Sequence, residues 1–143
     1  MKYKKLLNGS FAALAASVAL SGFHAEAVAK TVPVTIHAVE KDVVYDNKGS
    51  TYLGWTFGGV VPGPVVRVTE GDTIEFTLVN EESNKNSHSM DFHAARVDVV
   101  KDFDSVKPGE TKKFTFTADN PGVFFYHCGS DPMIQHIARG MYG

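Results

Sequence analysis

The chain has 143 residues, a length typical of one domain. Hydrophobic residues make up 43% and charged residues 21%, as in an ordinary soluble globular protein. The formal net charge of −2 argues against a nucleic-acid partner.

Residues 1–27 have the pattern of a secretory signal peptide. Three lysines lie among the first five residues, residues 6–20 are apolar and rich in small side chains, and residues 25–27 (Ala-Glu-Ala) form a cleavage pattern. A membrane-spanning helix is the competing interpretation, but Asn and Ser residues leave the apolar run too short and too polar. We therefore predict an exported protein, periplasmic or otherwise outside the cytoplasm, with residues 28–143 as its folded domain.

The remaining residues are typical of short strands separated by turns. Strands are predicted, in chain order, at residues 32–39, 51–57, 65–69, 73–79, 111–117 and 123–127. Turns are predicted at residues 70–72, 107–110 and 120–122, and a polar loop at residues 80–87. Because no stretch shows sustained helical periodicity, the pattern predicts an all-β fold, an antiparallel β-sandwich. An immunoglobulin-like binding module would share this pattern.

Cys128 is the only cysteine, so an exported form could not make an internal disulfide. It ends a hydrophobic strand and is followed by a loop with Gly and Pro, then by His136 and Met141. A thiolate, two imidazoles and a weak thioether suit copper, and His88 or His93 could supply the second imidazole. Zinc sites usually use more cysteines in closely spaced pairs. Each residue alone has a structural explanation, but their joint order predicts a mononuclear copper site.

The spacing of the histidines gives a second indication. Neighbouring strand residues point to opposite faces, so His127 and Cys128 must diverge, as must His88 and His93 in an extended segment. One imidazole from each segment would then point away from Cys128 and could begin a second metal site. Asp91 shares a face with His93 and is a candidate proton donor. The alternative is that these side chains are exposed polar residues without a metal.

The same segments resemble the N-terminal cupredoxin domain of copper-containing nitrite reductases. The matching stretches are HSMDFHAA (88–95), KPGETKKFTFTADNPGVFFYHC (107–128) and HIARGMYG (136–143). VVPGPVVRVTEGDTIEFTLVN (60–80) resembles the broader cupredoxin and multicopper oxidase pattern. The resemblance implies a cupredoxin-like Greek-key β-sandwich.

The resemblance also implies roles for individual residues. The ligands of a type 1 copper, which accepts an electron from a small redox protein, would be His88, Cys128, His136 and Met141. His93 and His127 would be two of three ligands of a type 2 copper that reduces nitrite to nitric oxide. Asp91 would hydrogen-bond nitrite and relay a proton, and the His127–Cys128 peptide would join the two coppers.

The chain also departs from this family. In the reductases, the third type 2 ligand and a second catalytic histidine come from a second domain, with the ligand supplied across the interface of a homotrimer. Here the remaining histidine of residues 28–143, His37, is expected to be an exposed strand residue. We therefore expect residues 28–143 to be a C-terminally incomplete domain of a nitrite reductase. The alternatives are a stand-alone cupredoxin electron carrier or another multicopper oxidase, although laccase-like His-x-His pairs are missing from the sequence.

Overall fold

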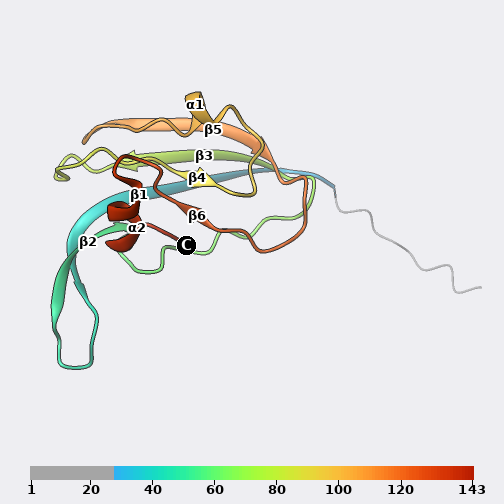
Figure 1. Ribbon diagram of the computed structural model, residues 1–143. Helices are drawn as coiled ribbons and strands as arrows, with labels where there is room; N and C mark the ends of the chain where they lie inside the picture. The colour runs from blue at the N-terminus through green and yellow to red at the C-terminus, as the bar shows by residue number, and fades with distance from the viewer. Residues whose placement is uncertain (1–27) are drawn as a thin grey trace, which may run out of the picture.

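The computed structural model describes residues 28–143, so the predicted signal peptide at residues 1–27 lies outside the described residues. The strands are β1 (Thr31–Val44), β2 (Thr51–Phe57), β3 (Thr73–Asn80), β4 (Asp91–Phe92), β5 (Thr111–Thr117) and β6 (Tyr126–His127). The helices are α1 (Val99–Asp102) and α2 (Met133–Ala138) (Figure 1). Neither helix in this part of the chain has the length and apolar character needed to span a bilayer.

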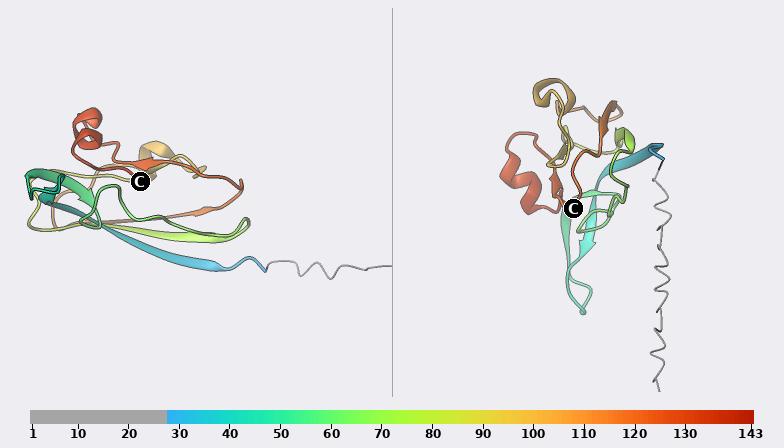
Figure 2. Two further views of the ribbon diagram at one scale, coloured as in Figure 1. Left: turned by 90° about the horizontal axis from the view of Figure 1, so that it is seen from below. Right: turned by 90° about the vertical axis from the view of Figure 1, so that its right-hand side faces the viewer.

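The strands form two sheets that pack face to face. The larger has the order β2-β1-β3-β5, and the smaller pairs β4 with β6. Figure 2 shows β6 and α2 lying over one side of the larger sheet. Aromatic rings join the layers, because Phe92 of β4 lies 4.9 Å, between ring centroids, from Phe76 of β3 and 5.4 Å from Phe116 of β5. The predicted all-β sandwich is thus confirmed.

Alternating side chains explain why β3 and β5 bury one face. Ile74, Phe76 and Leu78 of β3 are buried while their neighbours are more exposed, and Phe114 and Phe116 of β5 follow the same rule. A half-buried strand requires this period of two. The buried faces of these strands form the core against which the smaller sheet packs.

The sequence pattern predicted an antiparallel sandwich, but one strand pair of the larger sheet is parallel. β1 pairs in parallel with β3, from Thr31 opposite Thr73 to Ala38 opposite Asn80. Hydrophobic alternation reports which face of a strand is buried, and it carries no information on the direction of the neighbouring strand. The chain between β2 and β3 returns to the end of the sheet where β1 begins, which makes the two strands run the same way (Figure 1).

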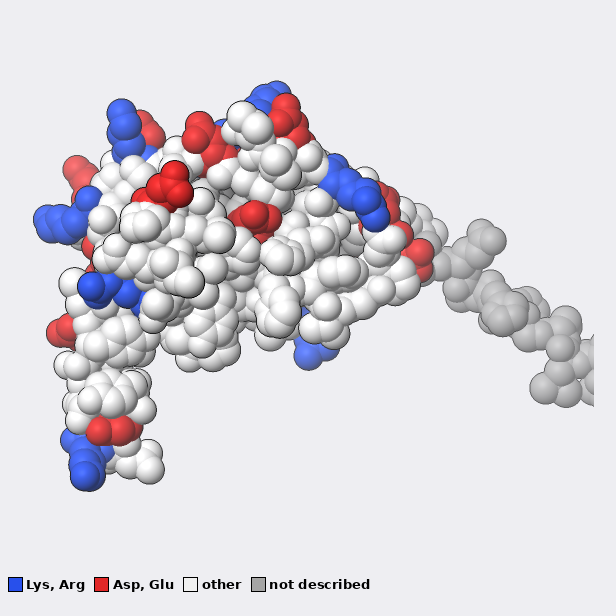
Figure 3. All heavy atoms as spheres, viewed as in Figure 1, with Lys and Arg blue, Asp and Glu red and all other residues white. Residues whose placement is uncertain are grey.

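Other local predictions also differ from the structure. Residues 65–69 do not form a strand, the predicted strand 123–127 is reduced to Tyr126–His127, and two short helices are present that had not been predicted. Residues 65–69 and 123–125 are mostly exposed, so their apolar and β-branched side chains do not mark buried strands. On the face seen in Figure 3, charged side chains of both signs are interspersed, in keeping with the small net charge.

We predict that Phe76→Ala lowers the free energy of unfolding by about 3–5 kcal/mol, because it removes a buried ring from the contact between the sheets. Urea denaturation would measure this loss. Val65→Ala is the control, because Val65 is 76% exposed and its truncation should change stability by less than about 0.5 kcal/mol. Equal effects of the two changes would contradict the packing described.

Candidate metal centre

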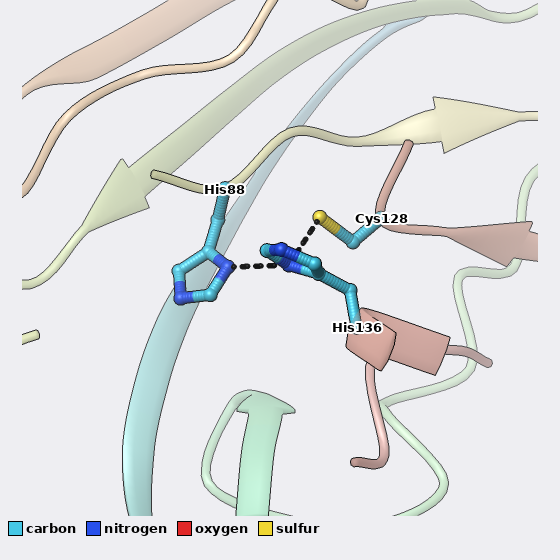
Figure 4. A group of neighbouring side chains, drawn as sticks. All are labelled: His88, Cys128 and His136. Atoms are coloured by element: carbon cyan, nitrogen blue, oxygen red, sulfur yellow. Dashed lines mark hydrogen bonds between the residues drawn. The ribbon is translucent and has the colours of Figure 1, made fainter. Parts of the chain in front are cut away.

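Three metal-ligating side chains meet in the interior of the sandwich: His88, Cys128 and His136 (Figure 4). One ligand atom from each lies within 4.8 Å of the others. His136 Nδ1 is 3.3 Å from Cys128 Sγ and 3.2 Å from His88 Nδ1. All three residues are buried. A sulfur and two imidazole nitrogens therefore converge on one point.

Each of these donors comes from a different part of the fold. His88 forms an antiparallel bridge with Val106, in which each backbone N–H donates to the other's carbonyl, at 3.0 and 2.9 Å. Cys128 follows β6 directly. His136 is the buried residue of α2, and its ring lies 4.6 Å, edge to face, from that of Trp55. Strand pairing, a strand end and a short helix thus fix the three donors independently.

Met141, the fourth predicted ligand, is fully buried beside this cluster. The Cys128 N–H donates to the Met141 carbonyl at 3.1 Å, and the Met141 N–H donates to the His136 carbonyl, also at 3.1 Å. The backbone therefore ties Met141 to two of the three donors.

The Cys128 sulfur lies in an environment that favours its ionised form. Burial raises the pKa of the thiol, but hydrogen bonds from four groups lower it by more, so that the pKa is about 5. These groups are the side chains of His136, His88 and Ser130 and the Ser89 N–H. The Ser89 N–H donates to the sulfur at 3.3 Å. The thiolate is the form of cysteine that binds metals. The site is thus prepared for a cation at neutral pH.

A buried carboxylate, which the sequence did not reveal, lies behind His88. Glu40 Oε1 is 3.1 Å from His88 Nε2, on the side of the ring away from the cluster. Burial raises the pKa of Glu40, but hydrogen bonds from Asn86, Lys85 and His88 lower the pKa below its ordinary value. Glu40 therefore stays ionised beside the site. It is a polar residue in a long strand, and nothing in the local sequence distinguishes it from a solvent-exposed one.

A second pair of imidazoles lies on the other side of β6. His93 Nε2 is 3.0 Å from His127 Nε2, and Asp91 lies directly opposite His127 in the β4–β6 pair. His93 is exposed and His127 half-buried, whereas Cys128 is fully buried, so adjacent residues do point to opposite sides. The two histidines border a cavity of about 310 Å³, whose other lining residues are Phe125, Tyr126, Ile137 and Tyr142.

His37 takes part in neither cluster. It lies on β1, is exposed and contacts the Glu81 carboxylate through Nδ1.

The donors suit copper better than zinc. One thiolate and two imidazoles, with a thioether residue buried alongside, are the set that copper uses when it carries electrons. A structural zinc site commonly takes more cysteines in a closed tetrahedron. The sandwich and this set together define a cupredoxin-like copper domain.

Comparison with known proteins agrees with this class. Residues 38–143 match the multicopper oxidase family, and the chain belongs to that family. Copper is the cofactor that the family and the donor set imply.

The relatives include several copper-containing nitrite reductases. The protein of Neisseria meningitidis serogroup A is 44% identical over 115 residues, which are 78% of this chain and 29% of that protein. The protein of Rhizobium sullae is 41% identical over 121 residues, 83% of this chain and 32% of that protein. The chain thus spans about a third of the length of these curated relatives.

Solved structures show the same likeness. The copper nitrite reductase from Nitrosomonas europaea is 83% identical with a TM-score of 0.78, over 79% of this chain and 40% of that one. A copper-containing nitrite reductase from Thermus scotoductus is 37% identical with a TM-score of 0.72, over 80% of this chain and 27% of that one. A multicopper oxidase is 30% identical with a TM-score of 0.70, over 79% of this chain and 40% of that one.

We predict that the metal-free protein releases the Cys128 proton near pH 5, whereas the ordinary pKa is 9.0. Between these values the unfolded chain holds a proton that the folded chain has lost, so the free energy of unfolding should rise with pH. This stabilisation should be lost as the pH falls through about 5. Thiolate ultraviolet absorption and urea denaturation across this range would measure both effects. Cys128→Ser should lack both, and a thiol that titrates near 9.0 would contradict the geometry.

Proposed function

We propose that this chain is the electron-accepting copper domain of a nitrite reductase that reduces nitrite to nitric oxide, as in denitrification. One observation carries the proposal: His127 and Cys128 are adjacent in sequence yet belong to two clusters on opposite sides of β6. The identities of 83% and 44% to copper nitrite reductases support it.

The first cluster would hold a type 1 copper through His88, Cys128 and His136, with the Met141 thioether as a weak fourth ligand. The second would hold a type 2 copper through His93 and His127. Its third ligand would come from outside residues 28–143, across an interface of a homotrimer. Bound copper would supply one-electron redox chemistry at both sites. The shared peptide of His127 and Cys128 gives the shortest covalent connection between the two ligand sets.

Asp91 would deliver protons to nitrite at the second site. Forming nitric oxide and water from nitrite consumes one electron and two protons, so a group that delivers protons is required. Asp91 lies opposite His127 in the strand pair, so both side chains leave the same face of the small sheet. Its carboxyl group would hydrogen-bond a nitrite oxygen and pass a proton to it.

The proposal includes the partners and location expected from the sequence. A small redox protein would deliver the electron to the type 1 site. The protein would be exported, to the periplasm in a bacterium, because residues 1–27 have the signal-peptide pattern.

Two substitutions at neighbouring positions test the two-site arrangement. Cys128→Ala should abolish the visible thiolate-to-copper absorption, because it removes the sulfur ligand. His127→Ala should keep that absorption but lower the copper content by about one ion per chain. Visible spectra and metal analysis of the copper-supplied natural assembly, which also provides the third ligand of the second site, would separate these outcomes. A coloured Cys128→Ala protein would exclude the type 1 assignment, whereas unchanged copper in His127→Ala would favour a single-copper electron carrier.

Asp91→Asn should slow nitrite turnover by about 10²- to 10⁴-fold, the usual contribution of a positioned acid. Copper content should stay the same, because Asp91 is not one of the proposed ligands. Nitric oxide formation by the natural assembly, with metal analysis alongside, would measure this. Asp119→Asn alters an exposed carboxylate and serves as the control. Equal rates for the two variants would remove Asp91 from the mechanism.

A further inference from the structure

The two nitrogens of the His88 ring face in opposite directions. Nδ1 lies 3.2 Å from His136 Nδ1, within the donor cluster. Nε2 lies 3.1 Å from Glu40 Oε1. The His88 side chain is 0% and the Glu40 side chain 6% exposed, so solvent barely reaches this contact. The imidazole is held between the metal-binding point and a buried carboxylate.

Glu40 is itself fixed by the neighbouring loop. Its Oε1 accepts hydrogen bonds from the Asn86 N–H and from Asn86 Nδ2, both at 2.9 Å. The Glu40 N–H donates to Asn84 Oδ1 at 2.8 Å, and Asn84 Nδ2 donates to the Ala38 carbonyl at 2.7 Å. These contacts join β1 to the loop that leads to His88. The carboxylate therefore has one position, which the chain sets without any metal.

The other imidazole of the cluster is held differently. The His136 ring packs in a T-shaped contact with the Trp55 ring, with ring centroids 4.6 Å apart. Within residues 28–143, the hydrogen-bond partners of the His136 side chain are His88 and Cys128, and no carboxylate is among them. Of the two imidazoles in the cluster, His88 is thus the one that is hydrogen-bonded to a carboxylate.

We propose that Glu40 is a positioning residue of the type 1 copper site: it keeps the Nε2 proton of His88, aims Nδ1 at the metal, and places a negative charge that favours the oxidised ion. A histidine ligand commonly donates its second ring N–H to a carboxylate, which fixes the tautomer and makes the other nitrogen more basic. A nearby negative charge stabilises Cu²⁺ more than Cu⁺ by Coulomb's law, so it lowers the reduction potential. This inference rests on the copper site of the proposed function, but not on nitrite as the substrate.

Substitution of Glu40 by Gln separates its charge from its shape. Gln keeps an oxygen that can accept from His88 and Asn86 but removes the negative charge. The full chain carrying Glu40→Gln should stay folded and coloured, and its reduction potential should rise. We expect the balance between Cu²⁺ and Cu⁺ to shift about tenfold toward Cu⁺, which is about 59 mV for one electron. Redox titration of the visible absorption would measure this shift.

Glu40→Ala also removes the acceptor. In addition to a raised potential, its copper affinity should fall by about 10- to 100-fold, the usual cost of losing such a partner. Competition with a copper chelator of known affinity would measure this. Glu81→Gln is the matched control, because Glu81 contacts the non-ligand His37 on the exposed face of β1. That variant should keep the wild-type potential and affinity.

Two outcomes would overturn the inference, and they can be told apart. If Glu40→Gln is coloured but has the same potential as Glu81→Gln, Glu40 only stabilises the fold, while the proposed function stands. If the wild-type chain takes up no coloured copper, the proposed function fails and this inference with it. Should Glu40→Ala not fold, the Glu40→Gln potential decides alone.

Discussion

The site depends on one constraint of extended backbone: consecutive side chains leave a strand on opposite sides. At the end of β6 this sends His127 toward His93 at the surface and Cys128 into the interior. Two donor clusters are thereby placed back to back with a single peptide bond between them. No loop or domain movement is needed to bring them together, because the strand geometry itself sets their separation.

The rest of the sandwich serves to hold the donors in place. Burying a polar side chain is unfavourable unless it is hydrogen-bonded. Around His88 this requirement is met by Glu40, Asn84 and Asn86, which link β1 to the loop before β4. The donors therefore converge through strand pairing and hydrogen bonds in the protein alone. The donor side chains should therefore move little when a metal binds or when the charge of the bound metal changes.

Sequence patterns predicted much of this architecture, but not all of it. The aromatic and β-branched residues at 51–57 and the alternation at 111–117 predicted β2 and β5 with their observed bounds. The spacing of Cys128 and His136 predicted two of the three donors in the buried cluster. The α2 helix was missed because six residues with one buried side chain show no periodicity. Glu40 was missed because it meets His88 across 48 residues of sequence, a contact that only the parallel β1–β3 pairing and the following loop create.

Residues 141–143 run back along β6. The Cys128 N–H donates to the Met141 carbonyl, and Tyr126 and Gly143 exchange backbone hydrogen bonds at 3.0 Å. The segment that carries His136 is therefore a loop closed at its base by main-chain hydrogen bonds, and Gly143 packs so closely on the Tyr126 ring that a Cβ there would clash with it. Its exposed outer residues, Asp131 and Pro132, could change at a modest entropic cost while the anchored ends keep their places, whereas the buried Ser130 hydrogen-bonds the Cys128 sulfur and belongs to the site. The ends of this loop and its exposed tip are thus under different physical constraints: the ends fix the donors, and the tip only has to connect them.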